Sequence, residues 1–224
     1  MSFSILFFID NLHAKVADTD HIVMDSEQGD FKPMQLNRTG DGKIIVTGTT
    51  MFHCTYHFGS DPENGGLNLT YNSLKYCIGE SGRVGCYGIG GLTSGQIGDV
   101  EYNLNSAFNT EYEFVSINSD DLLLDDEGQP FYDVVAVGYN WQDYLVHSQE
   151  AITEYIEAGG SVIVCGTGSL SGEIPFLPFS VYNYPYSYGE FPGPAADPDH
   201  PLAQNVNYGE WGYNSELHSQ ITEY

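Results

Sequence analysis

The sequence predicts an α/β fold built on a mostly parallel, doubly wound sheet with helices on both faces. Short apolar runs rich in β-branched residues, such as KIIVTG (43–48) and SVIVC (161–165), are typical of strands that are buried on both faces. Segments with apolar side chains at helical spacing lie between such runs. This alternation indicates βαβ units, because two parallel neighbours need a long crossover connection, usually a helix.

The first part of the chain contains two predicted strands and one predicted helix. The apolar run at 3–9 is too short to span a membrane, lacks a cationic flank and is followed by an acidic residue, so it predicts a strand rather than a leader. The glycine-bounded run at 43–48 predicts a buried strand. A long polar loop is expected at 53–66, and a helix at 67–78 that ends at Gly79.

The second part of the chain continues the alternation of strands and helices. Its periodicity predicts, in order, a strand at 83–88, a helix at 97–108, strands at 112–117 and 133–138, a helix at 143–158 and a strand at 161–165. The Gly159-Gly160 pair is a typical helix stop. From residue 172 onward Pro, Gly and Tyr dominate, so we expect irregular structure and short strands there.

The charge of the chain is strongly one-sided. Six Lys and Arg face 31 Asp and Glu, and the net charge is −25. No Lys or Arg follows Arg83, although the remaining 141 residues hold 21 of the 31 acids. Such a segment cannot hold phosphate or an anionic membrane through side-chain cations, so nucleic acid and membrane insertion are not expected.

The same imbalance predicts adaptation to salt. The Debye length falls from about 10 Å at 0.1 M to about 3 Å at 1 M ionic strength, so concentrated salt removes most of the self-repulsion. The composition resembles that of proteins from halophilic archaea, which are rich in Asp and Glu and nearly lack Lys. A moderately acidic secreted or phage protein is the alternative source.

Three stretches together resemble one family. They are FYDVVAVGYNWQDYLVHSQEAITEYIEAGGSVIVCGTGS (131–169), DPDHPLAQNV (197–206) and GDGKIIVTGTTMFHCTYHFGSDPENGGLNLTYNSLKYCIG (40–79). The first two resemble the class I glutamine-amidotransferase-like superfamily, in particular its non-amidotransferase, trehalose-utilisation (ThuA-like) branch. The third is similar to the closing segment of the same kind of module. The resemblance implies a flavodoxin-like fold.

The resemblance also implies an unusual order of parts. Residues 1–80 look like the C-terminal segment of one module, docked on the rest, and residues 82–224 look like the head of a second module that is incomplete at its C-terminus. Either the chain is a fragment of a longer tandem protein, or the first block completes the sheet of the second. We expect the cell surface or the exterior for a fragment of an exported protein, and otherwise the cytoplasm of a high-salt cell.

Cys165 and His200 are the candidate catalytic residues. In glutamine amidotransferases the nucleophilic Cys follows this strand in a Gly-x-Cys-x-Gly turn, but here Ile163 and Thr167 replace both glycines. The family's His-Pro-Glu partner is also changed, because His200-Pro201 is followed by Leu202. The amidotransferase triad is therefore not recognisable, which favours a non-catalytic protein and a buried structural thiol at Cys165.

His53, His57 and Asp61 are the candidate metal ligands. Two imidazoles four residues apart, followed by a carboxylate, suit Zn²⁺ or another transition metal if the segment is helical or folds back on itself. The alternative is an ordinary loop packed through its aromatic side chains. The acids at 120–127 lack the spacing of an EF-hand, so we interpret them as a solvated turn.

A stripe of alternating tyrosines is the candidate ligand-binding surface. In an extended chain its members lie on one side, where they either stack on sugar faces or pack under a long loop. The stripe consists of Tyr182, Tyr184, Tyr186 and Tyr188.

These features favour a non-catalytic binding or assembly module of a larger, salt-adapted protein. The expected partners are other segments or subunits of an assembly, and carbohydrate at the tyrosine stripe. No cofactor is expected, and the acidic surface suits loosely bound cations. The alternative is a ThuA-like hydrolase or carbohydrate-active enzyme that uses acids and His200 at the carboxyl ends of the strands, where open α/β sheets bind ligands.

Overall fold

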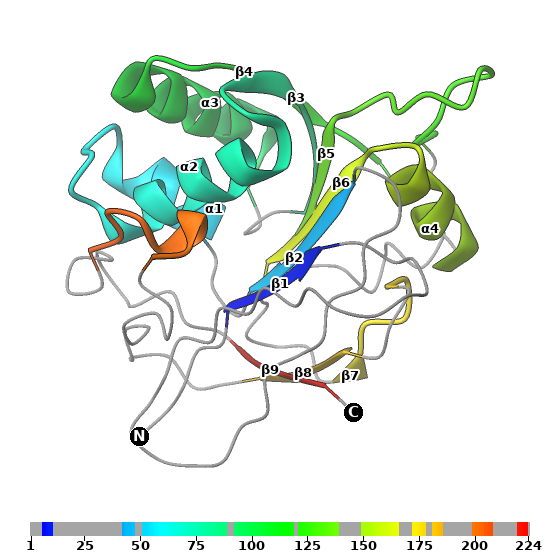
Figure 1. The fold of residues 1–224 in the computed structure, drawn as a ribbon. Helices are drawn as coiled ribbons and strands as arrows, with labels where there is room; N and C mark the ends of the chain where they lie inside the picture. Colours follow the sequence, from blue (N-terminus) through cyan, green and yellow to red (C-terminus); the bar gives the residue numbers. More distant parts are fainter. Residues whose placement is uncertain are drawn as a thin grey trace.

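A computed structural model of the protein describes residues 6–10, 42–47, 51–88, 92–118, 121–138, 149–165, 172–177, 181–185, 199–207 and 219–223. These residues form a six-stranded sheet flanked by helices and a separate three-stranded sheet (Figure 1). The larger sheet has the order β1-β2-β6-β5-β3-β4. Its strands are β1 (Leu6–Asp10), β2 (Lys43–Thr47), β3 (Ser81–Tyr87), β4 (Glu111–Ser116), β5 (Val134–Val137) and β6 (Ser161–Cys165).

Five strands of the larger sheet are parallel. Each neighbouring pair from β2 through β6, β5 and β3 to β4 runs in the same direction, and β1 pairs antiparallel with β2 at the outer edge. Every residue of the central strands β5 and β6 is buried, which explains their unbroken apolar sequences. The protein thus has the predicted α/β, flavodoxin-like fold.

Helices cover both faces of this sheet (Figure 1). They are α1 (Met51–Phe58), α2 (Gly65–Ile78), α3 (Ser94–Phe108) and α4 (Gln149–Glu157). The chain moves toward one edge of the sheet from β3 to β4 through α3, and in the opposite direction from β5 to β6 through α4. Because crossovers share one hand, opposite directions place α3 and α4 on opposite faces.

Local signals set the helix ends. The Asn64 side chain accepts a 3.0 Å hydrogen bond from the Leu67 amide at the start of α2, and Gly79 ends that helix with a φ of 81°. At the start of α3 the Thr93 amide donates to Gln96 Oε1 over 2.8 Å. This contact belongs to a capping box and explains why α3 begins at Ser94, earlier than the apolar periodicity predicted.

The prediction of a loop over 53–66 is wrong, because Met51–Phe58 forms helix α1. Met51, Phe52 and Cys54 are buried, and the Phe52 ring meets the Phe114 ring of β4 edge to face at 6.1 Å. The helix packs against α2 and α3, so tertiary contacts stabilise a segment with weak helical signals of its own. The polar and aromatic side chains on its outer face concealed the apolar stripe.

Strands from the two halves of the chain interleave in one sheet. Strand β2 lies between β1 and β6, with Ile44 opposite Val162 and Thr47 opposite Cys165. Residues before and after position 80 therefore share a single core, which contains the buried apolar side chains of both.

The C-terminal part adds a small antiparallel sheet and one short helix. The sheet has the order β7-β8-β9, formed by Gly172–Glu173, Val181–Pro185 and Ser219–Glu223. The 3₁₀ helix η3 (Pro201–Ala203) packs on α2. Short strands were expected in this region, but the sequence did not predict how they pair.

Candidate functional site

The carboxyl edge of the parallel sheet is the first candidate site. In open sheets of this kind ligands bind beyond the strand ends, where two neighbouring strands lead the chain in opposite directions. Here those neighbours are β3 and β5, whose ends are joined by a 3.0 Å hydrogen bond from the Gly138 amide to the Tyr87 carbonyl. Residues 89–91 and 139–148, which continue from this edge, lie outside the described part of the chain. A ligand site here stays a prediction.

Cys165 lies at the carboxyl end of β6, but its environment disfavours a thiolate. Its side chain is 2% exposed, and burial raises the pKa of the thiol because a charged sulfur would lose its hydration. Burial also raises the pKa of the Cys86 thiol on β3, and the neighbouring Cys165 adds to that shift. The turn at 166–168 lies outside the described residues. The position has the properties of a buried apolar residue.

His200 lies toward the other end of the sheet. Its ring is 5.6 Å from the ring of Tyr76, near the end of α2, and the Tyr76 carbonyl accepts a hydrogen bond from Lys43 Nζ at the start of β2. Cys165 pairs with Thr47 at the opposite end of β2, and the ends of a five-residue strand are ~13 Å apart. Cys165 and His200 do not form a nucleophile–base pair in this structure.

The local role of His200 is to begin η3. The buried ring accepts a 3.3 Å hydrogen bond at Nδ1 from the Leu202 amide, as a cap does. Asn72 of α2 then fixes the segment by donating from Nδ2 to the carbonyls of Leu202 (3.0 Å) and Gln204 (2.7 Å). Residues 199–206, the described part of the 197–206 motif, thus anchor the C-terminal segment to α2.

His53 and His57 lie on successive turns of α1 and converge. Their Nε2 atoms are 2.7 Å apart, with the rings at 70° to each other. Asp61 does not complete a three-ligand group: its carboxylate accepts a 3.0 Å hydrogen bond from the Glu63 amide, in the turn after the helix. Over the described ranges no three His, Cys, Asp or Glu side chains gather closely enough to hold a metal ion.

The tyrosine stripe is described only in part. Positions 182 and 184 lie in β8, where they pair with Thr222 and Gln220 of β9. Alternate positions of a strand share one face. Tyr186 and Tyr188 lie outside the described residues, so sugar binding by the stripe stays a prediction.

The turn between β4 and β5, which the sequence marked only by its acids at 120–127, carries exposed apolar side chains. Leu122 is 68% exposed and Phe131 is 42% exposed, on the two arms of a turn closed by the Leu124–Pro130 bridge. Asp125 shapes its tip by accepting 2.8 Å hydrogen bonds from the amides of Glu127 and Gln129. The turn projects from the body of the protein (Figure 1).

The three cations of the described segments each lie over a tyrosine ring. Lys43 Nζ is 4.1 Å from the ring centroid of Tyr76, Lys75 Nζ is 5.3 Å from that of Tyr71, and Arg83 Cζ is 5.3 Å from that of Tyr132. Such contacts stabilise a cation without a second charge. Only the four-residue spacing of Tyr71 and Lys75 was visible as a signal in the sequence.

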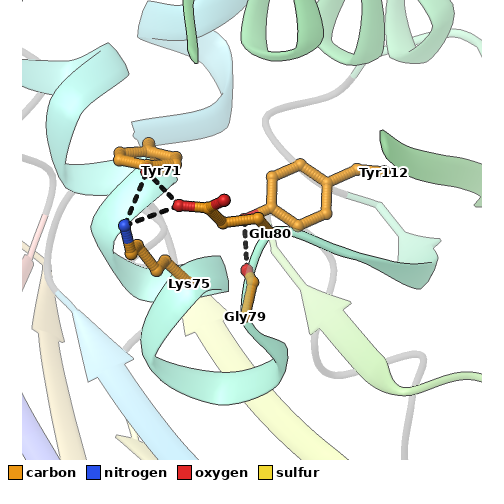
Figure 2. A network of polar contacts seen from close by, with 5 residues as sticks. All are labelled: Tyr71, Lys75, Gly79, Glu80 and Tyr112. Carbon is orange, nitrogen blue, oxygen red and sulfur yellow. Dashed lines mark hydrogen bonds and ion pairs between the residues drawn. The ribbon is translucent and has the colours of Figure 1, made fainter. Parts of the chain in front are cut away.

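Lys75 also forms the centre of a polar network at the turn from α2 to β3 (Figure 2). It donates to Glu80 Oε1 over 2.8 Å and to the Tyr71 hydroxyl over 3.0 Å. The hydrogen bond from Lys75 lowers the pKa of the Glu80 carboxyl. This network lies at the amino end of the sheet, so its role is to hold the turn rather than the candidate site.

The fold and these side chains define an α/β flavodoxin-like protein with a buried strand-end thiol and a histidine pair on α1. Comparisons with protein-family models, with curated proteins and with solved structures found no match. Among the helices of the described residues, none has the length and apolar character needed to cross a membrane.

Proposed function

We propose that the chain is a non-catalytic, glutamine-amidotransferase-like binding or assembly module of a larger, salt-adapted protein. The motifs at 40–79, 131–169 and 197–206 support the family, and a parallel sheet with helices on both faces is the architecture that this family implies. The net charge of −25 supports the adaptation to salt.

The state of Cys165 is the observation that carries the non-catalytic part of the proposal. A nucleophilic Cys needs a cationic or His neighbour that lowers its pKa, whereas burial raises the pKa of this thiol. His200 acts as the cap of η3 and lies toward the amino end of the sheet. Both observations support structural roles for the two residues that the family pattern nominated.

The projecting turn between β4 and β5 supports the binding part of the proposal. Leu122 and Phe131 are two of the three large apolar side chains that are exposed in the described residues. Two exposed apolar side chains on one projecting turn offer a protein partner an apolar contact. Asp126 and Glu127 at the tip of the same turn are exposed, so salt would reduce their repulsion of an acidic partner.

The proposal is tested by the reactivity of the thiols in the native protein. We expect iodoacetamide at neutral pH to label the half-buried Cys77 first, and to label Cys165 only as fast as the protein unfolds. Mass spectrometry of the digested protein assigns each rate. Cys165→Ala should leave the fold intact and lower the free energy of unfolding by about 1 kcal/mol, because one buried heavy atom is removed.

Cys77→Ala is the matched control, because it removes the more accessible thiol and leaves β6 unchanged. The non-catalytic proposal is overturned if Cys165 reacts faster than Cys77 and if a glutaminase activity of the wild-type protein disappears in Cys165→Ala but persists in Cys77→Ala.

A further inference from the structure

We infer that His53 and His57 form a bidentate site for a divalent transition metal, with Cu²⁺ as the ion that fits best. The two side chains lie on successive turns of α1, with Nε2 atoms 2.7 Å apart. Two histidines at this spacing on one helix face are an established arrangement of metal ligands. The inference concerns α1 alone and is independent of the proposed binding module.

The distance between the two nitrogen atoms matches the geometry of a metal centre. With metal–nitrogen bonds of 2.0–2.1 Å, two ligands at a right angle have nitrogens about 2.9 Å apart, and two ligands at a tetrahedral angle about 3.3 Å apart. The observed 2.7 Å needs only a small opening of the rings to reach the first value. Square-planar coordination by nitrogen and oxygen is typical of Cu²⁺, which also binds such ligands most tightly among the divalent ions.

The helix holds the pair in this position before any ion arrives. Met51, Cys54 and Thr55 are buried, and Thr55 Oγ1 lies 3.0 Å from both the Met51 carbonyl oxygen and Thr70 Oγ1, with its single hydroxyl proton donated to one of them. The backbone that carries the histidines is therefore fixed against α2. A site whose ligands are already ordered loses less conformational entropy on binding.

Tyr56 further orders the two imidazoles. Its ring is stacked parallel to that of His53, with centroids 6.5 Å apart, and meets the ring of His57 edge to face at 4.8 Å. Restricting the rings favours the rotamers in which the two Nε2 atoms lie close together.

The electrostatic surroundings favour a cation at this point. His57 lies in the last turn of α1, where the carbonyl end of the helix dipole attracts positive charge. The net charge of −25 raises the local concentration of cations around the chain. Because His57 is exposed, water can reach the ion and take part in its coordination.

Titration calorimetry with CuCl₂ tests the site. The wild-type protein is titrated in excess Mg²⁺, which occupies the surface carboxylates, and is compared with His53→Gln, His57→Gln and the control His147→Gln. We expect the wild type and the control to bind one equivalent of Cu²⁺ with the same affinity. The affinity of each pair variant should be at least tenfold lower, since losing even an outer partner of a metal ligand costs about 10–100-fold.

Electron paramagnetic resonance of the Cu²⁺-loaded wild-type protein gives a second readout that does not depend on the folding of any variant. The wild-type spectrum should show coupling of the copper signal to two imidazole nitrogens. The spectrum of each pair variant should show coupling to one imidazole nitrogen. The inference is overturned if the wild-type spectrum shows oxygen ligands only, or if the variants bind Cu²⁺ as the wild type does.

Discussion

Tyr112 adds a part-buried hydrogen bond to the turn between α2 and β3 (Figure 2). Its hydroxyl donates to the Gly79 carbonyl over 2.6 Å, and the side chain is only 3% exposed. Burial raises the pKa of the Tyr112 phenol, so the hydroxyl keeps its proton and remains a donor at neutral and moderately alkaline pH. The turn that joins the first part of the chain to β3 therefore depends on a residue of β4.

Tyr112→Phe should lower the free energy of unfolding by about 0.5–1.5 kcal/mol, because the ring still packs but the Gly79 carbonyl loses its partner. Urea unfolding at high salt, followed by circular dichroism, measures the change. Tyr102→Phe is the control, since this tyrosine is 70% exposed and its loss of a hydroxyl should change nothing. Equal stability of Tyr112→Phe and the wild type would contradict the role assigned to the hydrogen bond.

For the histidine pair, the sequence predicted the chemistry of the side chains but not the local structure that carries them. The spacing of His53 and His57 suggested metal ligands, but the same segment was predicted to be a loop. Only the packing of α1 against α2 and α3 places the two Nε2 atoms 2.7 Å apart. The spacing of the pair was informative because helical neighbours recur every four residues, whereas Asp61 lies beyond the end of the helix.

At the scale of elements, two glycines have opposite roles. Gly160 is buried immediately before β6, and a Cβ there would lie 2.3 Å from the ring of Tyr155 in α4. The absence of a side chain lets α4 approach the strand that follows it. Gly98 is exposed within α3, and a Cβ there would meet no atom within 4 Å.

Alanine at these two positions should therefore change stability in opposite directions. Gly160→Ala is expected to cost about 1–3 kcal/mol or more, because a buried aromatic ring must move. Gly98→Ala should raise stability by about 1 kcal/mol, because alanine favours the helix. Thermal unfolding of both variants under one buffer condition gives the comparison, and a change of the same sign in both would contradict this assignment.

At the scale of the whole molecule, the charge determines how the surface is solvated, and the strand topology determines which residues share the core. Lys75 and Arg83 pair with Glu80 and Glu113, but six Lys and Arg cannot balance 31 Asp and Glu, so water and salt ions must solvate the excess of carboxylates. The core joins both halves of the chain, because β2 pairs with β6 across more than a hundred residues. Repulsion among exposed acids therefore lowers the stability of one cooperative folding unit.

We expect the melting temperature to rise steeply between about 0.1 and 2 M KCl, because screening relieves repulsion among the carboxylates. Differential scanning calorimetry across this range measures the effect. Sucrose serves as the control, since it strengthens burial without screening charge. A melting temperature that does not change with KCl would contradict salt adaptation.

Sequence periodicity was sufficient for the central strands and for most helices. β6 has the predicted bounds, and β2, β5, α2 and α3 differ from prediction by a few residues at their ends. These elements carry their own signals, in apolar runs, helical spacing and caps, which act over a few neighbouring residues. α1 lacked such signals, because its helical state depends on partners that are distant in the chain.

The sequence by itself determined the class of the fold, the charge of the surface and the identity of the candidate side chains. Only the tertiary structure decided that β2 lies between β1 and β6, that Cys165 and His200 lie toward opposite ends of the sheet, and that His53 and His57 meet. The physical reason is the distance along the chain over which each kind of interaction acts. Backbone propensities act between near neighbours, whereas the convergence of side chains into a site depends on the order in which strands pair across the whole chain.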